Sequence, residues 1–413
     1  MRRIAVFFAA FLAAANLSAA TADNGSCDIT TAPAATLLLP YFEVDIEAPA
    51  SSALNTVFTV VNTSKYPQVV RATMWTDLGF PAAWFNMFLT GYDAQTVSLY
   101  EVLARGRFPM TTAHGSTGAL SSPNNANPNI LSQRLCHPFG GVVPEPVLRR
   151  LQKAFTTGER DEPECRVGLR HRNAIGYITL DVVNSCALES PLSPHYWSDV
   201  LLYDNVLIGD FIRLNPDDSA GNYAGATPLV HIRAVPEGGS AGSSPTVPLP
   251  YTFYDRYTPS GAKKSDRRQP LPSTFAARFI EGGPTDFRTA FTLWREGVVA
   301  TETSECAYAK NAAVPVRQAS IVRFDEHENS TALSSAVSTP VALHVSTSSA
   351  FFPPLGASGD RGGWFWISLD HGAAASRPSQ NWISVQMSAE GRYAVDVDAT
   401  WLASGCVAPP AAP

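Results

Sequence analysis

Short segments rich in β-branched and aromatic residues recur along the chain, each bounded by turn-forming residues. They read NTVFTVVNT, QVVRATMWTD, GYITLDVVNS, VLIGDFIRL, PLVHIRAV, TFAARFIEG, RTAFTLWRE, ASIVRFDE, GWFWISL, NWISVQM and RYAVDVDATWLA. This length and composition are typical of β-strands. The last segment has the clearest period of two: every second residue from Tyr393 to Trp401 is apolar, and Asp396, Asp398 and Thr400 lie between them. This alternation predicts one packed face and one face in water.

Helical periodicity is found mainly in PEPVLRRLQKAFTTG, where Val147, Leu148, Leu151 and Phe155 recur at helical spacing and Gly158 ends the pattern. A helix is therefore expected near residues 145–157. So little helix between strands excludes parallel βαβ units. We predict a mostly β protein with two antiparallel, immunoglobulin-like β-sandwich domains and one short helix in the first half.

Two polar stretches interrupt the strand pattern. Residues 105–143 include a region without periodicity, Thr111–Asn129, and are expected to form a long loop. Residues 236–250, PEGGSAGSSPTVPLP, have the composition of a linker. The predicted domains are therefore an N-terminal sandwich at 23–235 and a C-terminal sandwich at 251–413.

The N-terminus has the layout of a secretory signal peptide. Arg2 and Arg3 precede an apolar run that ends in small residues. Ala20-Thr21-Ala22 predicts cleavage after residue 22, and a site two residues earlier is the alternative. The apolar run is too short to span a bilayer stably, and Asn24-Gly25-Ser26 before Cys27 is a poor lipoprotein signal. Residues 1–22 are thus expected to be removed, leaving a secreted or periplasmic chain without a membrane span.

Composition and charge narrow the class of partner. Hydrophobic residues make up 45% and charged residues 16% of the chain, as in a folded protein. Removal of Arg2 and Arg3 leaves 28 basic against 36 acidic residues, a net charge of −8 instead of −6. This sign opposes binding of a polyanion, so no nucleic acid is expected. The densest basic cluster, KKSDRR at Lys263–Arg268, is expected to form a solvated turn.

All six cysteines lie in the predicted mature chain. An even number in an exported protein predicts disulfides, and no pair has the C-x-x-C spacing of a zinc or redox site. The order along the chain favours three pairings, which are Cys136 with Cys165, Cys306 with Cys406, and Cys27 with Cys186.

One stretch matches the G-x-S-x-G pattern of serine hydrolases, at Gly238–Gly242 with Ser240 at its centre. A nucleophile elbow requires a strained turn from a strand into a helix. Pro245 and Pro248 exclude that helix, so we interpret the match as linker composition. None of the eight histidines lies in an H-E-x-x-H or H-x-H arrangement. No catalytic residue, cofactor or metal ligand is therefore assigned.

Two polar clusters have side chains of the kind that bind cations. In Asp325–Asn329, at the end of an apolar strand, alternate side chains share a side, so a cation site or an acid/base pair is one interpretation. A solvated strand end is favoured over it. Asn215–Asn222 lacks the alternating ligands and final glutamate of a calcium-binding loop and is interpreted as a turn.

Four stretches resemble exported bacterial proteins of unknown function: TLLLPYFEVD, TMWTDLGFP, FLTGYDAQT and GYITLDVVNSC. The resemblance extends along much of the mature chain and implies an exported β-rich protein. It implies no activity and no site residue.

Two classes of function fit these observations. The first is an exported, non-enzymatic protein with a structural or binding role in the periplasm or at the cell surface, with a protein or a glycan as partner. The alternative is a secreted hydrolase acting on glycans or esters, with dispersed catalytic residues such as Asp255, Asp325 and Glu326. Repeated strands and the lack of a catalytic motif favour the first class.

The segment GGWFWISLDHG contains the one candidate binding platform. Trp364 and Trp366 project from one face of the predicted strand, and Phe365 and Ile367 from the other. Exposed tryptophans would stack on sugar rings or on a partner's surface. The favoured interpretation is that the adjoining domain or the loop at 351–354 covers both faces. Charged residues near enough to orient a polar ligand are Asp360, Arg361 and Asp370.

Overall fold

The computed structural model describes residues 29–110, 122–125, 141–160, 165–186, 189–193, 195–215, 226–235, 237–238, 252–253, 266–297, 314–316, 318, 320–354, 361–369, 379–389 and 393–403. Strands account for 49% and helices for 8%, which confirms the predicted mostly β class with antiparallel sheets. Within these ranges, no helix combines the length and apolar character needed to cross a membrane. The predicted signal peptide, 1–22, lies outside the described residues.

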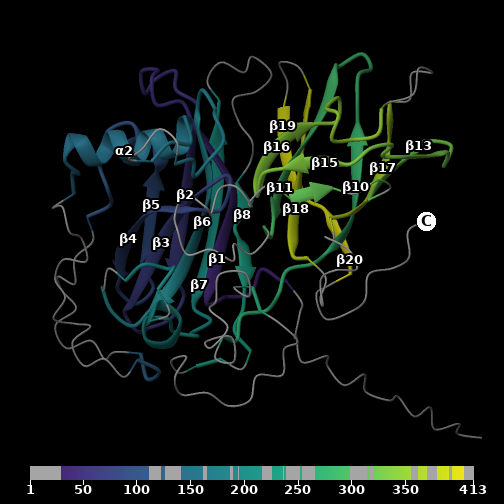
Figure 1. Ribbon diagram of the computed structural model, residues 1–413. Coiled ribbons are helices and arrows are strands. Elements are labelled where there is room, and N and C mark those ends of the chain that lie inside the picture. Colours follow the sequence, from purple (N-terminus) through teal and green to yellow (C-terminus); the bar gives the residue numbers. More distant parts are fainter. Residues whose placement is uncertain are drawn as a thin grey trace, which may run out of the picture.

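The described strands between Thr36 and Ile232 form the first sandwich, which consists of two antiparallel sheets (Figure 1). One sheet has the strand order β4-β3-β6-β1-β9, and the other has the order β5-β2-β7-β8. The strands are β1 (Thr36–Val44), β2 (Asn55–Asn62), β3 (Gln68–Thr76), β4 (Pro81–Leu89), β5 (Ala94–Ser98), β6 (Ala174–Val183), β7 (Leu207–Leu214), β8 (Thr227–Pro228) and β9 (Val230–Ile232).

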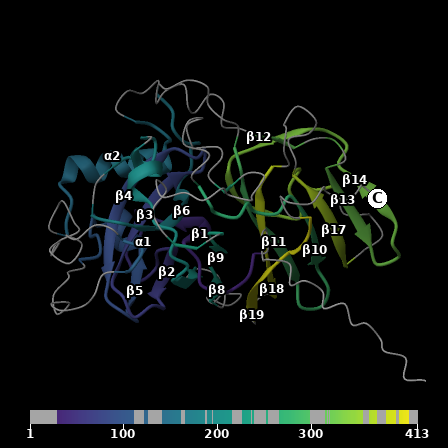
Figure 2. The same cartoon turned by 90° about the horizontal axis from the view of Figure 1, so that it is seen from below.

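The described strands between Thr274 and Ala403 form the second sandwich (Figure 2). Its sheets have the orders β14-β13-β17-β10-β20 and β16-β11-β18-β19, and β12 and β15 form a two-stranded ribbon. Its strands are β10 (Thr274–Ile280), β11 (Phe287–Arg295), β12 (Val314–Val316), β13 (Ile321–Asp325), β14 (Ser330–Ala332), β15 (Val337–Thr339), β16 (Ala342–Ser346), β17 (Gly362–Ser368), β18 (Asn381–Ala389), β19 (Tyr393–Asp398) and β20 (Thr400–Ala403).

Among the residues that the structure describes, two helices and one short π-helical turn accompany the strands. The predicted helix is present as α2 (Glu145–Thr156), and Gly158 beyond it has a φ of +69°. A shorter helix, α1 (Leu99–Leu103), was not predicted; the hydroxyl of Ser98 caps its N-terminus by accepting a hydrogen bond from the Glu101 N–H. The π-helical turn is η2 (Tyr196–Val200). Both α-helices contribute to the core of the first sandwich.

The burial of the strands reveals a contact between the sandwiches. In β2, buried and half-buried residues alternate, because only one face packs on a core. In β1 nearly every residue is buried. Leu37 and Leu39 face the core of the first sandwich, whereas Leu38 and Tyr41 join a second cluster that includes Trp294 and Trp382 of the second sandwich. The strand is therefore packed on both faces.

Aromatic rings dominate this shared cluster. Trp75 stacks on Tyr177 with ring centroids 5.8 Å apart, and Tyr177 meets the edge of Trp294 at 6.0 Å. All three side chains are almost completely buried. The sheet with β11 and β18 lies against the first sandwich, so that the four sheets form consecutive layers (Figure 1). The two halves thus share a core and are not joined by a linker alone.

The prediction that KKSDRR forms a solvated turn is wrong for its last residues. Arg267 and Arg268 are almost completely buried. The Arg268 guanidinium pairs with Asp266 at 3.2 Å and donates from Nε to Oγ1 of Thr36 in β1 at 2.5 Å. Thr36 in turn donates to Asp181 of β6 at 2.7 Å. Because buried cations need such partners, these arginines anchor the connecting segment to the first sandwich.

Several predictions fall on residues that the structure does not describe. Cys165 and Cys186 are both disulfide-bonded, but Cys27, Cys136, Cys306 and Cys406 lie outside the described residues, so the three pairings stay predictions. Most of the predicted loop at 105–143 and most of the predicted linker at 236–250, including Ser240, also lie outside the described residues. The domain boundaries and the immunoglobulin-like subtype also stay predictions.

Candidate functional site

The last predicted strand divides between the two sheets of the second sandwich. Its first part, β19, pairs with β18 as far as Asp398 opposite Ser384. Its second part, β20, pairs with β10 from Thr400 opposite Ala276. The buried Ala399 lies between the two parts. The chain therefore crosses from one sheet to the other within a single residue, and the two sheets diverge there.

The sequence predicts that the apolar face of residues 393–401 is packed and that the polar face is exposed to solvent, and this prediction is wrong. Val395 and Val397 are 42% and 43% exposed, whereas the side chain of Asp396 is only 5% exposed. Asp396 faces the first sandwich, where Oδ2 accepts a hydrogen bond from Thr227 at 3.2 Å. The two valines face the core side of their sheet, at a place where β20 does not continue along β10. The alternation of apolar and polar residues is present, but Val395 and Val397 on its apolar face remain exposed.

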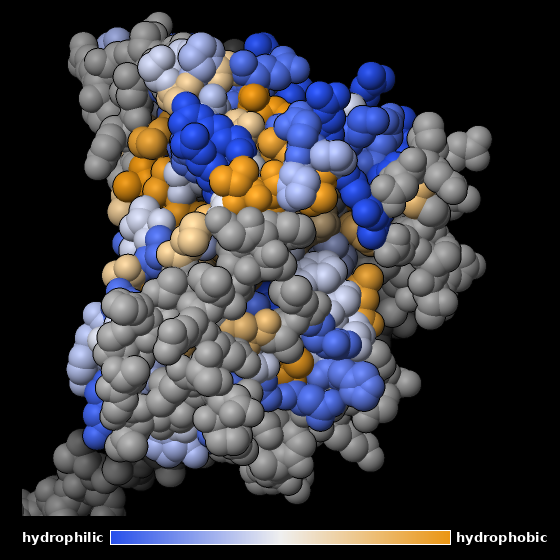
Figure 3. Space-filling model, turned by 90° about the vertical axis from the view of Figure 1, so that its left-hand side faces the viewer, coloured by the Kyte–Doolittle hydropathy of each residue, from blue (hydrophilic) through white to orange (hydrophobic). Residues whose placement is uncertain are grey.

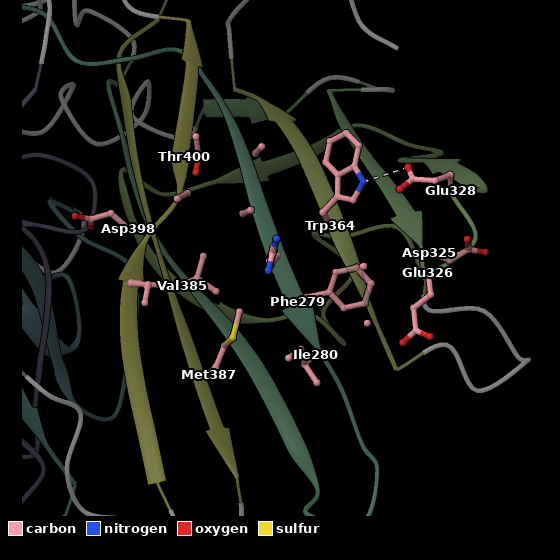
Figure 4. A pocket seen from close by; sticks show the side chains of 17 residues that line it. Phe279, Ile280, Asp325, Glu326, Glu328, Trp364, Val385, Met387, Asp398 and Thr400 are labelled. Carbon is pink, nitrogen blue, oxygen red and sulfur yellow. Dashed lines mark hydrogen bonds between the residues drawn. The ribbon is translucent and has the colours of Figure 1, made fainter.

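A groove of about 670 Å³ opens where β10 and β19 diverge (Figure 4). We call it the β10 groove. Its large apolar side chains come from four strands and are Phe279, Ile280, Trp364, Val385, Met387 and Val397. Its charged side chains are Arg278, Asp325, Glu326, Glu328 and Asp398. An apolar floor with a few charged groups at the margin is the composition of a ligand-binding site.

The turn between β13 and β14 supplies the acidic margin. Asp325 is held in this turn: its carboxylate accepts hydrogen bonds from the N–H groups of His327 and Asn329, at 2.8 and 2.9 Å, and from the Asn329 amide at 2.9 Å. The Asn329 amide and these N–H groups lower the pKa of Asp325. Glu326 and Glu328 remain exposed. The predicted solvated strand end is thus correct for the glutamates, whereas Asp325 is a structural residue.

The candidate tryptophans lie on the outer face of β17, as the alternation predicts, and Phe365 and Ile367 lie in the core. Trp366 is buried against Val322 and Phe324. Trp364 is half-buried and stacks on Phe324, with centroids 4.1 Å apart. Its indole N–H donates to Glu328 at 3.4 Å (Figure 4). Only Trp364 of the pair lines the groove.

The other residues expected around the platform are placed differently. Phe351 and Phe352 pack on the inner face of β17, where Phe352 lies 4.8 Å from Phe365. The loop at 351–354 therefore covers the phenylalanine side and not the tryptophans. Arg361 is exposed, and its carbonyl accepts a hydrogen bond from Glu281 N–H at 2.7 Å. Asp360 and Asp370 lie outside the described residues.

One glycine is required in the groove wall. Gly363 has a φ of +151°, and a Cβ atom there would collide with the carbonyl oxygen of Phe324 on β13. Only glycine adopts this conformation without strain and permits this close approach of two strands. The rim formed by β13 and β17 is therefore defined by backbone packing.

Asp398 is the carboxyl group in the groove lining with a raised pKa. Asp398 is exposed, but neighbouring atoms displace part of the water around its carboxyl group, which raises the pKa to about 6; a hydrogen bond with the Trp382 side chain opposes this shift and the neighbouring Asp396 adds to it. Figure 4 shows Asp398 pointing away from Glu326 and Glu328. The groove therefore has carboxylates on two separate sides.

A second polar cluster lies between the sandwiches. Arg213 of β7 is 3.1 Å from Nδ1 of His344 on β16 and 3.8 Å from Asp396. Burial, and then the charge of Arg213, lower the pKa of His344 well below its usual value. His344 is thus held neutral and bonds to Thr292 at 3.1 Å. This arrangement joins the two sandwiches. Among the described residues, no group of His, Cys, Asp and Glu could hold a metal ion.

The hydrolase candidates are only partly brought together. Asp325 and Glu326 both line the groove, whereas Asp255 lies outside the described residues. Arg278, Ile280 and Val397 were not identified from the sequence. The signal that could have found Val397 is the alternation from Tyr393 to Trp401, but a sequence alone does not show where its facing strand ends.

Comparison with models of protein families gave no match, and comparisons with curated proteins and with solved structures gave none. Functional conclusions therefore depend on the groove itself.

Proposed function

We propose that this chain is an exported, non-enzymatic binding protein and that the β10 groove holds its ligand. One observation carries the proposal: Val397, with Val395 beside it, is more than 40% exposed on the core side of a sheet. Ile280, across the groove, is also exposed. Leaving apolar side chains in water costs about 25 cal/mol per Å². Such surfaces on folded proteins commonly mark binding sites.

The chemistry of the groove favours binding over catalysis. Its described lining has carboxylates but no histidine, cysteine or serine. Hydrolysis of glycans by two carboxyl groups requires both of them at one bond. Asp398 points away from Glu326 and Glu328, so Asp398 and either glutamate are not placed to act together on one glycosidic bond (Figure 4). Export is supported by the signal-like N-terminus and by the even number of cysteines.

The experiment uses Nile red, a neutral dye that fluoresces in apolar sites, with the full mature chain. We expect saturable fluorescence, and we expect Val397→Asp to reduce it by about tenfold, because a carboxylate would then occupy the apolar floor. The matched control is Val147→Asp. Val147 is another exposed valine, on α2, at the opposite end of the molecule from β10 (Figure 1). Equal loss of fluorescence in both variants, or in neither, would refute the groove as the site.

The alternative function is tested separately. The mature chain is incubated with glycan, ester and peptide substrates, and the Glu326→Gln variant is assayed in parallel. We expect no turnover above the buffer rate. Reproducible turnover that Glu326→Gln abolishes would replace the binding proposal with the hydrolase.

A further inference from the structure

The edge of β10 that borders the groove lacks a neighbouring strand over half of its length. On one side, β10 pairs with β17 along its whole length, from Thr274 to Ile280. On the other side it pairs with β20 only as far as Ala276. Among the described residues, no strand lies beside the remaining four residues, Ala277–Ile280. At about 3.3 Å per residue, this free edge is about 13 Å long, but at its far end the backbone of Ile280 is already bonded to the side chain of Thr289.

The orientation of the backbone at this edge follows from its hydrogen bonds. The Glu281 N–H donates to Arg361, beside β17. The N–H and C=O of Ile280 point the other way and bond to Oγ1 of Thr289, at 2.9 and 2.7 Å. Because the direction alternates along a strand, the N–H and C=O of Arg278 also point away from β17. They face the groove, where an added strand would pair with them.

The groove also has two different sides for the side chains of an added strand. A strand beside β10 would direct alternate residues to the core side, where Val385, Met387 and Val397 lie. The residues between them would point to the outer side. Arg278 lies on that side, because it alternates with the core residues Ala277 and Phe279. Glu326 and Glu328 also line the groove, on the side of β13 (Figure 4). Four carboxylates against one guanidinium line the groove as a whole.

We propose that the β10 groove binds an extended segment of a partner polypeptide, with alternating apolar and basic residues, which pairs with the free edge of β10. The backbone hydrogen bonds would supply affinity, and the apolar floor and acidic margin would supply selectivity, as in other complexes formed by strand addition. This inference rests on the proposed function and specifies its ligand. It also explains why the edge of β10 at Arg278 is left without a neighbouring strand, since unpaired edges are otherwise an aggregation hazard.

The probe is a fluorescein-labelled peptide of about eight residues that alternates valine and lysine, titrated into the mature chain and followed by fluorescence anisotropy. We expect saturable binding that a peptide of alternating valine and glutamate does not show. A third peptide, with N-methyl groups on alternate backbone nitrogens, cannot donate to β10 and is expected to lose binding completely.

Two variants at one position separate backbone pairing from charge. Arg278→Pro removes the N–H that faces the groove, and an exposed edge tolerates proline; we expect affinity for the lysine peptide to fall by about five- to tenfold. Arg278→Ala keeps the N–H and removes a like charge, so affinity should rise slightly. If Arg278→Pro does not fold, the N-methylated peptide alone decides the question.

The outcomes also distinguish this inference from the proposed function. Nile red binding without peptide binding would leave the groove as a site and overturn strand addition, as would peptide binding that N-methylation leaves intact. Absence of both would overturn the two together. If sedimentation shows that the chain itself dimerises and that Arg278→Pro dissociates the dimer, the occupant is a second copy and the partner peptide is wrong.

Discussion

The two sandwiches differ in how the space between their sheets is closed. In the first, α1 and α2 cover one side: Leu103 and Leu148 join the core, and the ring of Phe155 packs on Phe42 at 5.5 Å. In the second, the ribbon of β12 and β15 and the Phe351–Phe352 pair join the core. The margin between β10 and β19 has no helix beside it among the described residues.

This difference suggests a division of roles. The face on the side of α2 and β4, seen in Figure 3, carries hydrophobic residues among hydrophilic ones. The second sandwich exposes Val395 and Val397 of its own inner face beside a groove. The shared aromatic core between the sandwiches fixes the second against the first. A rigid scaffold that holds one open margin is what a binding site requires.

The largest effect on stability is expected at α2, which covers one side of the first sandwich. Phe155→Ala should lower the free energy of unfolding by about 3–5 kcal/mol, because it leaves a cavity beneath α2 that the rigid sheets cannot fill. Urea denaturation followed by tryptophan fluorescence measures this. A loss under about 1 kcal/mol would mean that α2 does not close the core.

The two tryptophans of β17 should contribute differently to stability, because they differ in burial. Trp366→Ala should cost about 3 kcal/mol, because its side chain is almost completely buried against Val322 and Phe324. Trp364→Ala should cost about 1 kcal/mol, since the ring is half-buried and stacks on Phe324 alone. Thermal melting of both variants checks the ranking. Equal costs would argue against the difference in burial.

Much of the fold could be predicted from the sequence because most strands carry their own signal. The segment 55–62 alternates and forms β2, and the helix at 145–157 is marked by its period and by Gly158. The segment TLLLPYFEV is not among the strands that the sequence predicts, although it forms β1. A strand buried on both faces is a continuous apolar run, which has no period of two to detect.

The site was harder to predict because it depends on contacts between distant segments. Alternation from Tyr393 to Trp401 continues through Ala399, so nothing local marks the change of sheet. Whether Val397 is covered depends on how far β20 follows β10, more than 100 residues earlier in the chain. Arg268 is a second example of a residue whose surroundings come from distant segments. Its neighbours in the sequence indicate a solvated turn, but in the structure Arg268 contacts Thr36 and Asp181.

A smaller effect is expected from pH at the margin of the groove. The pKa of Asp398 is raised from 3.8 to about 6, so the folded state favours the protonated form. Its contribution to stability is fully present below pH 3.8 and is lost as the pH rises through about 6. Asp398→Asn should therefore raise the free energy of unfolding at pH 8 by about 1 kcal/mol, allowing for screening by solvent.

The measurement is a series of melting curves between pH 4 and 8 for the parent chain and for Asp398→Asn. The two melting temperatures should nearly coincide at pH 4 and separate as the pH rises. A separation that grows in the opposite direction would show that the carboxylate is stabilised by its surroundings, contrary to the assigned cause.

The smallest effect on stability is expected at the open margin itself, where Val397→Thr should change the free energy of unfolding by less than about 0.5 kcal/mol. Threonine has nearly the same shape and β-propensity, and the site is already 43% exposed. The matched change Val385→Thr, on the neighbouring strand and almost completely buried, places a hydroxyl in the core and should cost about 1–3 kcal/mol. Urea denaturation of the two variants compares a closed and an open position on one sheet face. Equal costs would mean that Val397 is covered in solution, and the groove would then be closed.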